Sequence, residues 1–240
     1  MYVAPQLRSF EHFSFVAFAL LGSALGCSDS PKQSNADKPA TGQPQTPTKS
    51  AAEDRAGVQG AFDRYRRAIA NSDGQKAAEV MAAATIQEYQ NYREWALTAD
   101  KASLSQQRVD QQRQVLFYRL RLKAEQLEAM DGKALFTHAV NEEWVGKESV
   151  AALSLGDIHV AGNRATAKII VSGKPTTSEF DFVKEGEAWR LDMSRFSKAI
   201  GERLAEQVKK TGKTIDEYLL ENLSELEGEP VGDKVWLPLK

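Results

Sequence analysis

The sequence predicts an α+β fold, because the spacing of its apolar residues changes twice along the chain. Between residues 55 and 141 apolar side chains recur every three or four positions, the period of an amphipathic helix. Between residues 154 and 193 they alternate, the period of a strand with one buried face. The helical spacing returns after Ser194. Helices, then strands, then helices are typical of an α+β domain rather than of repeated β-α units.

The first helical block is expected to hold four helices. One begins at Arg55, a second begins near Lys76, a third spans about Leu104–Met130, and a fourth spans 133–141. Turns that contain glycine end the first and the third. The apolar face of the first helix carries Val58, Phe62, Tyr65 and Ile69.

The strand block is expected to form a curved antiparallel sheet of four strands. The strands are 154–160, 164–171, 176–184 and 188–193, and the short turns between them are typical of hairpins. The alternation places these side chains on the dry face: Phe180, Phe182, Trp189, Leu191 and Met193. Arg190 and Asp192 should then face solvent, and the preceding helices should cover the dry face.

Two further helices are expected at the C-terminal end. The first repeats apolar residues every four positions from Phe196, and the second begins at Thr214, which forms a capping-box pattern with Glu217. The chain then ends in an apolar stretch around Trp236. A free apolar end is unfavourable in water, so this stretch should dock on the globular body.

The N-terminal residues 1–26 have the pattern of an export signal, with an apolar stretch that ends in small residues. The only cysteine of the chain, Cys27, follows at once. The segment Ala24-Leu25-Gly26-Cys27 resembles the bacterial lipoprotein signal. In that family a peptidase cuts before the cysteine, which becomes the acylated first residue. The resemblance implies export to the bacterial cell envelope and a lipid anchor at Cys27. The alternative is a secreted protein whose cysteine has no role.

Residues 28–54 are expected to form a flexible tether. They contain no Val, Ile, Leu, Met or aromatic residue and hold four of the eight prolines. Such a segment cannot bury enough apolar surface to offset the entropy lost on ordering. The predicted organisation is therefore a signal peptide at 1–26, the lipidated cysteine and linker at 27–54, and a folded part from Arg55.

The composition excludes several classes of protein. Lys and Arg number 31 against 33 Asp and Glu, so the basic excess typical of nucleic-acid binders is missing. One cysteine cannot form an intramolecular disulfide framework, and three histidines make a histidine-rich metal centre an unfavoured reading. No cofactor or metal is expected.

The order of helices followed by a strand meander resembles the NTF2-like (cystatin-like, SnoaL-like) α+β cone. The residues that carry the resemblance are the hairpin Asp157–Ala167 and the segments Glu179–Gly186 and Ala188–Asp192. The resemblance covers 55–193, so the helices of 194–240 form an extension. Members of this superfamily include isomerases, dehydratases, cyclases and non-catalytic binding domains, so the fold does not select a function.

Five titratable residues are candidates for chemistry inside such a cone: His138, Glu142, Glu143, His159 and Asp181. A catalytic acid or base needs burial and hydrogen-bond reach to a substrate. Each has a plainer reading: His138 as a half-buried helix residue with a carbonyl partner, Glu142-Glu143 as a solvated pair, and His159 and Asp181 as outward-facing strand residues. None of them shows a recognised catalytic spacing.

Two further groups could form binding surfaces. The basic stretch 108–123 could touch anionic lipid or could be a solvated helix face. The aromatic residues Tyr65, Tyr89, Tyr92 and Trp95 could line an amphipathic pocket or belong to the core.

We therefore expect a lipid-anchored envelope protein whose domain binds a small molecule or a protein partner without catalysis. A small-molecule isomerase or dehydratase with His138 as its base is the second hypothesis. A structural or assembly role through the C-terminal helices and Trp236 is the third.

The anchor leads to a first prediction. Cys27→Ser should leave the precursor unprocessed at this site or release the domain from the membrane, because two or more acyl chains are needed for stable anchoring. Mass spectrometry of the native N-terminus should show a diacylated cysteine. An unmodified thiol, or a mature chain that begins well after Cys27, would contradict the lipoprotein interpretation.

Overall fold

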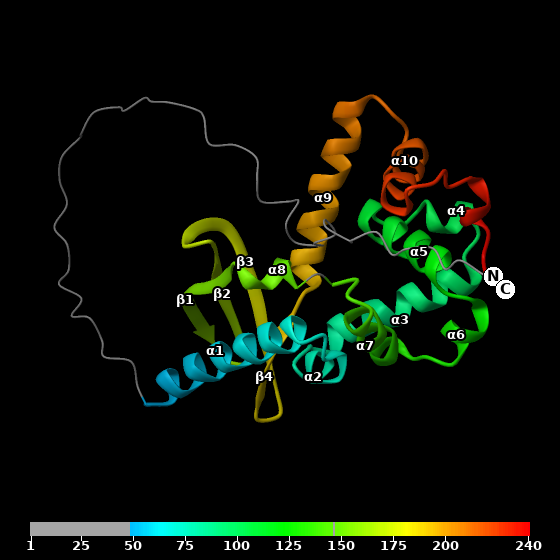
Figure 1. Ribbon diagram of the computed structural model, residues 1–240. Coiled ribbons are helices and arrows are strands. Elements are labelled where there is room, and N and C mark those ends of the chain that lie inside the picture. Colours follow the sequence, from blue (N-terminus) through cyan, green and yellow to red (C-terminus); the bar gives the residue numbers. More distant parts are fainter. Residues whose placement is uncertain (1–48, 146) are drawn as a thin grey trace, which may run out of the picture.

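The computed structural model describes residues 49–145 and 147–240 and has an α+β fold with a four-stranded antiparallel sheet (Figure 1). The strands follow one another in the order β1-β2-β3-β4. Their bounds are β1 Leu153–Ala161, β2 Arg164–Val171, β3 Lys174–Glu185 and β4 Ala188–Asp192. The helices are α1 Lys49–Ala70, α2 Gly74–Glu79, α3 Ala83–Thr98, α4 Lys101–Leu104, α5 Val109–Arg121, α6 Ala124–Glu128, α7 Gly132–Asn141, α8 Glu148–Ala151, α9 Ser194–Thr211 and α10 Ile215–Glu227. A 3-10 helix, Asp233–Trp236, follows α10.

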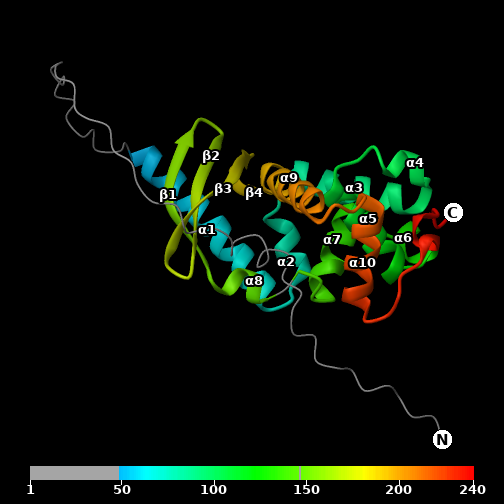
Figure 2. The ribbon, with the colours of Figure 1, turned by 90° about the horizontal axis from the view of Figure 1, so that it is seen from above.

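The described part of the molecule is elongated and has two lobes (Figure 2). The sheet lobe consists of the sheet with α1 and α8, and its core joins α1 to the inner sheet face. The helical lobe contains α3, α5, α6, α7 and α10 around a second core. Helix α9 lies between the lobes and contacts both β3 and α5. Its Phe196 belongs to the first core and its Val208 to the second.

The predicted inner faces of α1 and of the sheet are confirmed. Val58, Phe62, Tyr65 and Ile69 are buried, as are Phe180, Phe182, Trp189 and Leu191. Met193 is half-buried and lies just after β4, at the start of α9.

The contact between α1 and Trp189 is very close. Gly57 faces the indole ring, and a Cβ at this position would lie 2.6 Å from Trp189 Cδ1. The indole Nε1 donates a hydrogen bond to Asp54 Oδ1 at 3.1 Å, and Lys184 Nζ lies 2.9 Å from the same oxygen. These contacts hold the polar first turns of α1 on the sheet, so the helix begins at Lys49 and not at Arg55.

Two predicted helices are interrupted. The helix expected from Lys76 is divided into α2 and α3, because Met81 forms a parallel bridge with Leu191 of β4. The helix expected over Leu104–Met130 is divided into α4, α5 and α6. Leu122 is extended at the end of α5, which lets Leu127 reach the helical core from a different axis. The spacing of apolar residues does not reveal these breaks, because each of the shorter helices keeps the same helical period.

Arg190 and Asp192 are not the solvated side chains that alternation predicts. Asp192 Oδ1 accepts hydrogen bonds from the backbone N and the Oγ of Ser194, at 3.0 and 2.6 Å, where α9 begins. Arg190 pairs with Glu185 and donates to the carbonyl oxygen of Glu79. Both side chains therefore connect β4 to its neighbours.

The C-terminal segment docks on the helical lobe, as predicted. Trp236 is 2% exposed, and the buried guanidinium of Arg119 lies beneath it. Arg119 donates to the backbone oxygens of two separate segments, which are Trp95, Ala96 and Ala99 at the end of α3 and Val235 and Trp236 near the C-terminus. Burial lowers the pKa of Arg119 to about 10, so the group stays charged at neutral pH.

A pair of glycines on α1 tests the contact with Trp189. Gly57→Ala should destabilise the protein by about 1–3 kcal/mol, because the new methyl group overlaps the buried indole. Gly60→Ala, one turn later, should stabilise it by about 0.5–1 kcal/mol, since it meets Arg64 Nη1 only at 3.5 Å and removes a helical glycine. Denaturant titration measures both, and equal effects would contradict the packing.

Neighbouring residues test the C-terminal docking. Trp236→Ala should lower the free energy of unfolding by about 3–5 kcal/mol, because it empties a buried site. Leu237→Ala should change it by less than about 0.5 kcal/mol, because this side chain is 62% exposed. Thermal or denaturant unfolding measures the difference. An unchanged free energy of unfolding in Trp236→Ala would show that the docked segment does not stabilise the fold.

Candidate functional site

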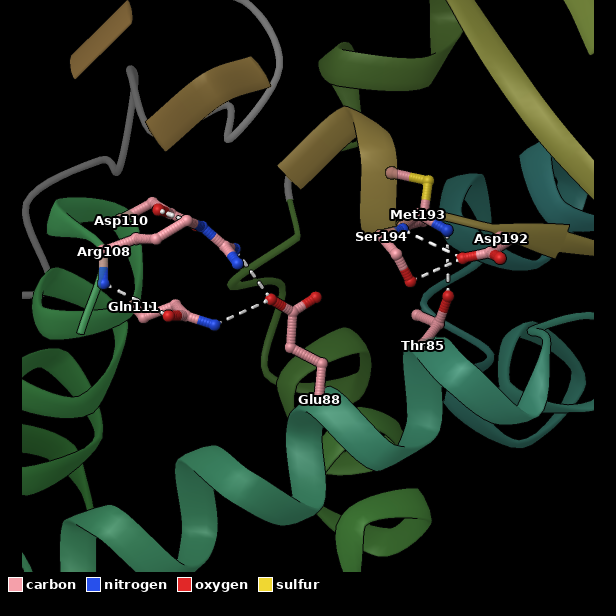
Figure 3. A network of polar contacts seen from close by, with 8 residues as sticks. All are labelled: Thr85, Glu88, Arg108, Asp110, Gln111, Asp192, Met193 and Ser194. Carbon is pink, nitrogen blue, oxygen red and sulfur yellow. Dashed lines mark hydrogen bonds and ion pairs between the residues drawn. The ribbon is translucent and has the colours of Figure 1, made fainter. Parts of the chain in front are cut away.

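The inner face of α3 carries two polar contacts, one to the junction of β4 and α9 and one to the start of α5 (Figure 3). Thr85 Oγ1 accepts a hydrogen bond from the backbone N of Met193 at 2.9 Å, at the junction of β4 and α9. One turn further, Glu88 Oε1 accepts hydrogen bonds from Arg108 Nη2 at 2.9 Å and from Gln111 Nε2 at 3.3 Å. The side chain of Glu88 is 13% exposed, so this carboxylate is largely buried with its partners.

Arg108 also holds Asp110, through Nε at 3.0 Å and Nη2 at 2.8 Å. Helix α9 passes close to this pair, since a Cβ on Gly201 would lie 2.1 Å from Asp110 Oδ1. Arg108 is thus shared by the two carboxylates of the cluster, Glu88 and Asp110. Such an arrangement holds α3 against α5, and it commits one oxygen of Glu88 and both oxygens of Asp110 to Arg108.

A narrow internal cavity of about 80 Å³ lies beside this network. Aromatic residues are the largest group in its walls and include Tyr65, Tyr89, Tyr92, Tyr118 and Trp144. The Tyr118 hydroxyl is buried and has no hydrogen-bond partner of ordinary geometry among the described residues. Burial raises the pKa of Tyr65 to about 12 and also raises that of Tyr118, so these phenols are neutral at physiological pH.

The size of the cavity limits what it can hold. Ligand pockets of proteins usually measure about 300–1,000 Å³. An engineered cavity of about 150 Å³ holds one benzene molecule. In the conformation described, the interior therefore has room for a few waters but not for a metabolite of ordinary size.

A much larger open groove, of about 990 Å³, lies on the surface where the lobes meet. One wall is the second half of α1, and the floor includes the end of α2 and the start of α3. The other sides are the start of α7 and the edge of β4 at residues 188–190. Its volume is that of a typical binding site, and its openness suits a ligand that extends beyond it.

The cations and the carboxylates of the groove differ in how many already have a partner within the described chain. Arg64 and Arg67 of α1 are exposed, as is Lys133 in the first turn of α7, and none of the three has an ion pair within the described chain. Most groove carboxylates are already engaged. Asp73 caps α2, Asp131 caps α7, and Glu185 accepts a hydrogen bond from Ala83 N and pairs with Arg190. Among the described residues of the groove, Glu79 is the carboxylate without a cap or an ion pair, so the unpaired cations outnumber the unpaired carboxylates by three to one.

His138, the candidate base, lines neither the cavity nor the groove. It is half-buried on α7, as its plainer reading predicts, but its neighbour is a ring rather than a carbonyl. Its imidazole lies edge-on to Trp144, with ring centroids 5.1 Å apart.

The other candidates lie at the surface, and two of them, Glu143 and Asp181, have structural partners. Glu142 and His159 are exposed, while Glu143 pairs with Lys147 and accepts a hydrogen bond from Ser72. Asp181 points away from the core but is not simply solvated, because Arg195 Nε lies 2.6 Å from its Oδ2. Partial burial raises the pKa of Asp181 despite this partner.

The basic stretch 108–123 forms neither a lipid-facing surface nor a fully solvated face. Arg108 pairs with Glu88 and Asp110, Arg113 bonds Asn222, Arg119 is buried, and Arg121 pairs with Glu227. Of the aromatic group, Tyr65, Tyr89 and Tyr92 line the cavity, whereas Trp95 packs near Tyr92 outside it. Trp236 is covered and cannot serve as an assembly surface.

Within 49–145 and 147–240, no three His, Cys, Asp or Glu side chains gather in a way that could hold a metal ion. No helix in this part of the chain combines the length and apolarity needed to cross a membrane. Cys27, the signal segment 1–26 and residues 28–48 of the linker lie outside the described residues.

No family model, no curated protein and no solved structure matches this chain.

The groove residues were missed in the sequence because they come from separate elements. Arg64, Lys133 and the edge of β4 lie far apart along the chain. The two arginines of α1 show the spacing of any polar helix face, so only the packing of α1, α7 and β4 distinguishes them.

The polar contact on α3 can be tested with a pair of glutamates. Glu88→Ala should lower the free energy of unfolding by about 2 kcal/mol, because it removes the acceptor shared by Arg108 and Gln111. Glu94→Ala, on the exposed face of the same helix, should cost less than about 0.5 kcal/mol. Chemical denaturation measures both, and equal losses would show that the network does not join the helices.

Proposed function

We propose that this protein is a lipid-anchored component of the bacterial cell envelope that binds a partner in the open groove without catalysis. The observation that carries the proposal is the groove of about 990 Å³, whose walls hold unpaired cations and an edge strand. The sequence of signal, Cys27 and tether supports anchoring, because a long flexible linker lets a domain reach partners near a membrane surface.

Three observations favour binding over catalysis. His138 lies away from both the groove and the cavity. The carboxylate nearest the cavity, Glu88, is committed to Arg108 and Gln111. The cavity itself has too little volume for a substrate of the isomerase or dehydratase kind.

We also propose that the sheet lobe is a variant of the NTF2-like cone. Helix α1 crosses the inner face of a four-stranded meander, and the strands come after helices in the chain (Figure 1). Helices α9 and α10 and the helical lobe would be additions that close the wide end of such a cone and leave a small cavity inside.

Site-specific photo-crosslinking in the native envelope tests the binding function. A photoreactive amino acid at Gln87, an exposed groove residue, should give a defined adduct that mass spectrometry can identify. The same residue at Glu202, exposed on α9 outside the groove, is the control and should not give that adduct. Lys76, a second exposed groove residue, is probed in the same way. The same adducts from the groove and the control positions, or no adduct from either Gln87 or Lys76, would overturn the proposal.

A further inference from the structure

We infer that the groove binds an extended acidic peptide segment, which pairs with the free edge of β4 at Trp189 and directs its carboxylates towards Arg64, Arg67 and Lys133. The inference rests on the proposed binding function and names the chemistry of the partner.

Only part of the outer edge of β4 forms backbone hydrogen bonds with the described chain. Leu191 N donates to Val80 O at 2.8 Å, and Leu191 O accepts from Ala82 N at 2.9 Å. Backbone groups of a strand alternate in direction, so the N–H and C=O of Trp189 point to the same outer side. No other backbone group of the described chain bonds them, and residues 188–190 line the groove.

The segment 80–82 shows that an extended chain fits against this edge. Its Met81 forms the parallel bridge to Leu191. The pairing stops there because the preceding residues fold into α2, whose Glu79 carbonyl oxygen accepts from Arg190. Among the described residues, the edge therefore has no backbone partner from Trp189 towards the turn at Gly186. A strand supplied by a partner would continue a pairing that the chain begins, which is the mode of β-augmentation.

The charges of the groove select the side chains of that strand. Arg64 and Arg67 lie one turn apart on α1, and Lys133 lies on the opposite side, on α7. All three are exposed and have no ion pair in the described chain, whereas Asp73, Asp131 and Glu185 are engaged in caps and pairs. Carboxylates at alternate positions of a strand would supply the missing negative charge.

A peptide fits these features better than a flat anionic membrane or a polyanion. The cations line a concavity, so a planar headgroup surface would not reach all of them at once. A polyphosphate could meet the cations but would leave the donor and acceptor of Trp189 without partners. An acidic peptide satisfies the charges and the backbone together.

The test uses the lipid-free chain from Ser28 onward and a fluorescent seven-residue peptide of alternating Glu and Val. We expect saturable binding, and protection of the Trp189 amide from hydrogen exchange when the peptide is bound. A peptide of alternating Lys and Val should not bind. Arg64→Gln with Arg67→Gln should weaken binding roughly tenfold, since two ion pairs are lost. Arg55→Gln, an exposed arginine of α1 outside the groove, is the matched control and should have no effect.

A second probe separates the backbone contact from the charge contact. The second peptide has the same sequence but carries backbone N-methyl groups at alternate residues, so it keeps its carboxylates and loses half of its N–H donors. Two versions exist, methylated at the odd or at the even residues, and one of them should bind at least tenfold more weakly. Equal affinity of both versions and of the double variant would overturn the inference. Equal or tighter binding of inorganic polyphosphate or anionic vesicles at the same arginines would assign the groove to another class of anion. If the acidic peptide fails while Gln87 crosslinks a specific partner, the peptide inference fails and the binding function stands.

Discussion

The packing of Trp189 against α1 is the contact on which the arrangement of the sheet lobe depends. Its indole fills the space left by Gly57 and donates to Asp54, so the long first helix is fixed on the inner face of the sheet. The side chain of Trp189 points into the core, while its backbone lies at the outer edge of β4. One residue thus fixes the helix that forms one wall of the groove and also lines the groove itself.

The helical lobe relies on a different kind of interaction. The charge of Arg119 is buried without a carboxylate and is stabilised by backbone oxygens at the end of α3 and in the C-terminal segment. Unpaired carbonyl groups at a helix end need donors, and a planar guanidinium can serve several at once. The cation therefore joins the end of α3 to the C-terminal segment by binding carbonyl oxygens of both. The buried side chain of Trp236 covers this contact.

Charge is distributed differently in the interior and in the groove. In the interior, Arg108 is shared by Glu88 and Asp110 and connects α3 to α5, where α9 passes close to Asp110 (Figure 3). In the groove, capping and pairing engage most carboxylates, while three cations have no ion pair with any residue that the structure describes. A protein that needed only stability would gain little from such an imbalance, because exposed unpaired charges contribute almost nothing to folding. The proposed acidic partner would supply the negative charge that the groove lacks.

The sequence by itself determined the α+β class, the four strands, the buried faces of α1 and of the sheet, and the docking of the C-terminal end. These depend on local periodicity and on the cost of exposing apolar side chains, which can be read along the chain. It also predicts the lipid anchor at Cys27, which remains a prediction. Only the tertiary structure decided where α3 begins, because the break at Met81 is imposed by pairing with Leu191. Arg119 and Arg64 are both arginines on helices, and the sequence does not distinguish them. Tertiary packing places the end of α3 and the C-terminal segment around Arg119, which is buried, whereas Arg64 lines the open groove.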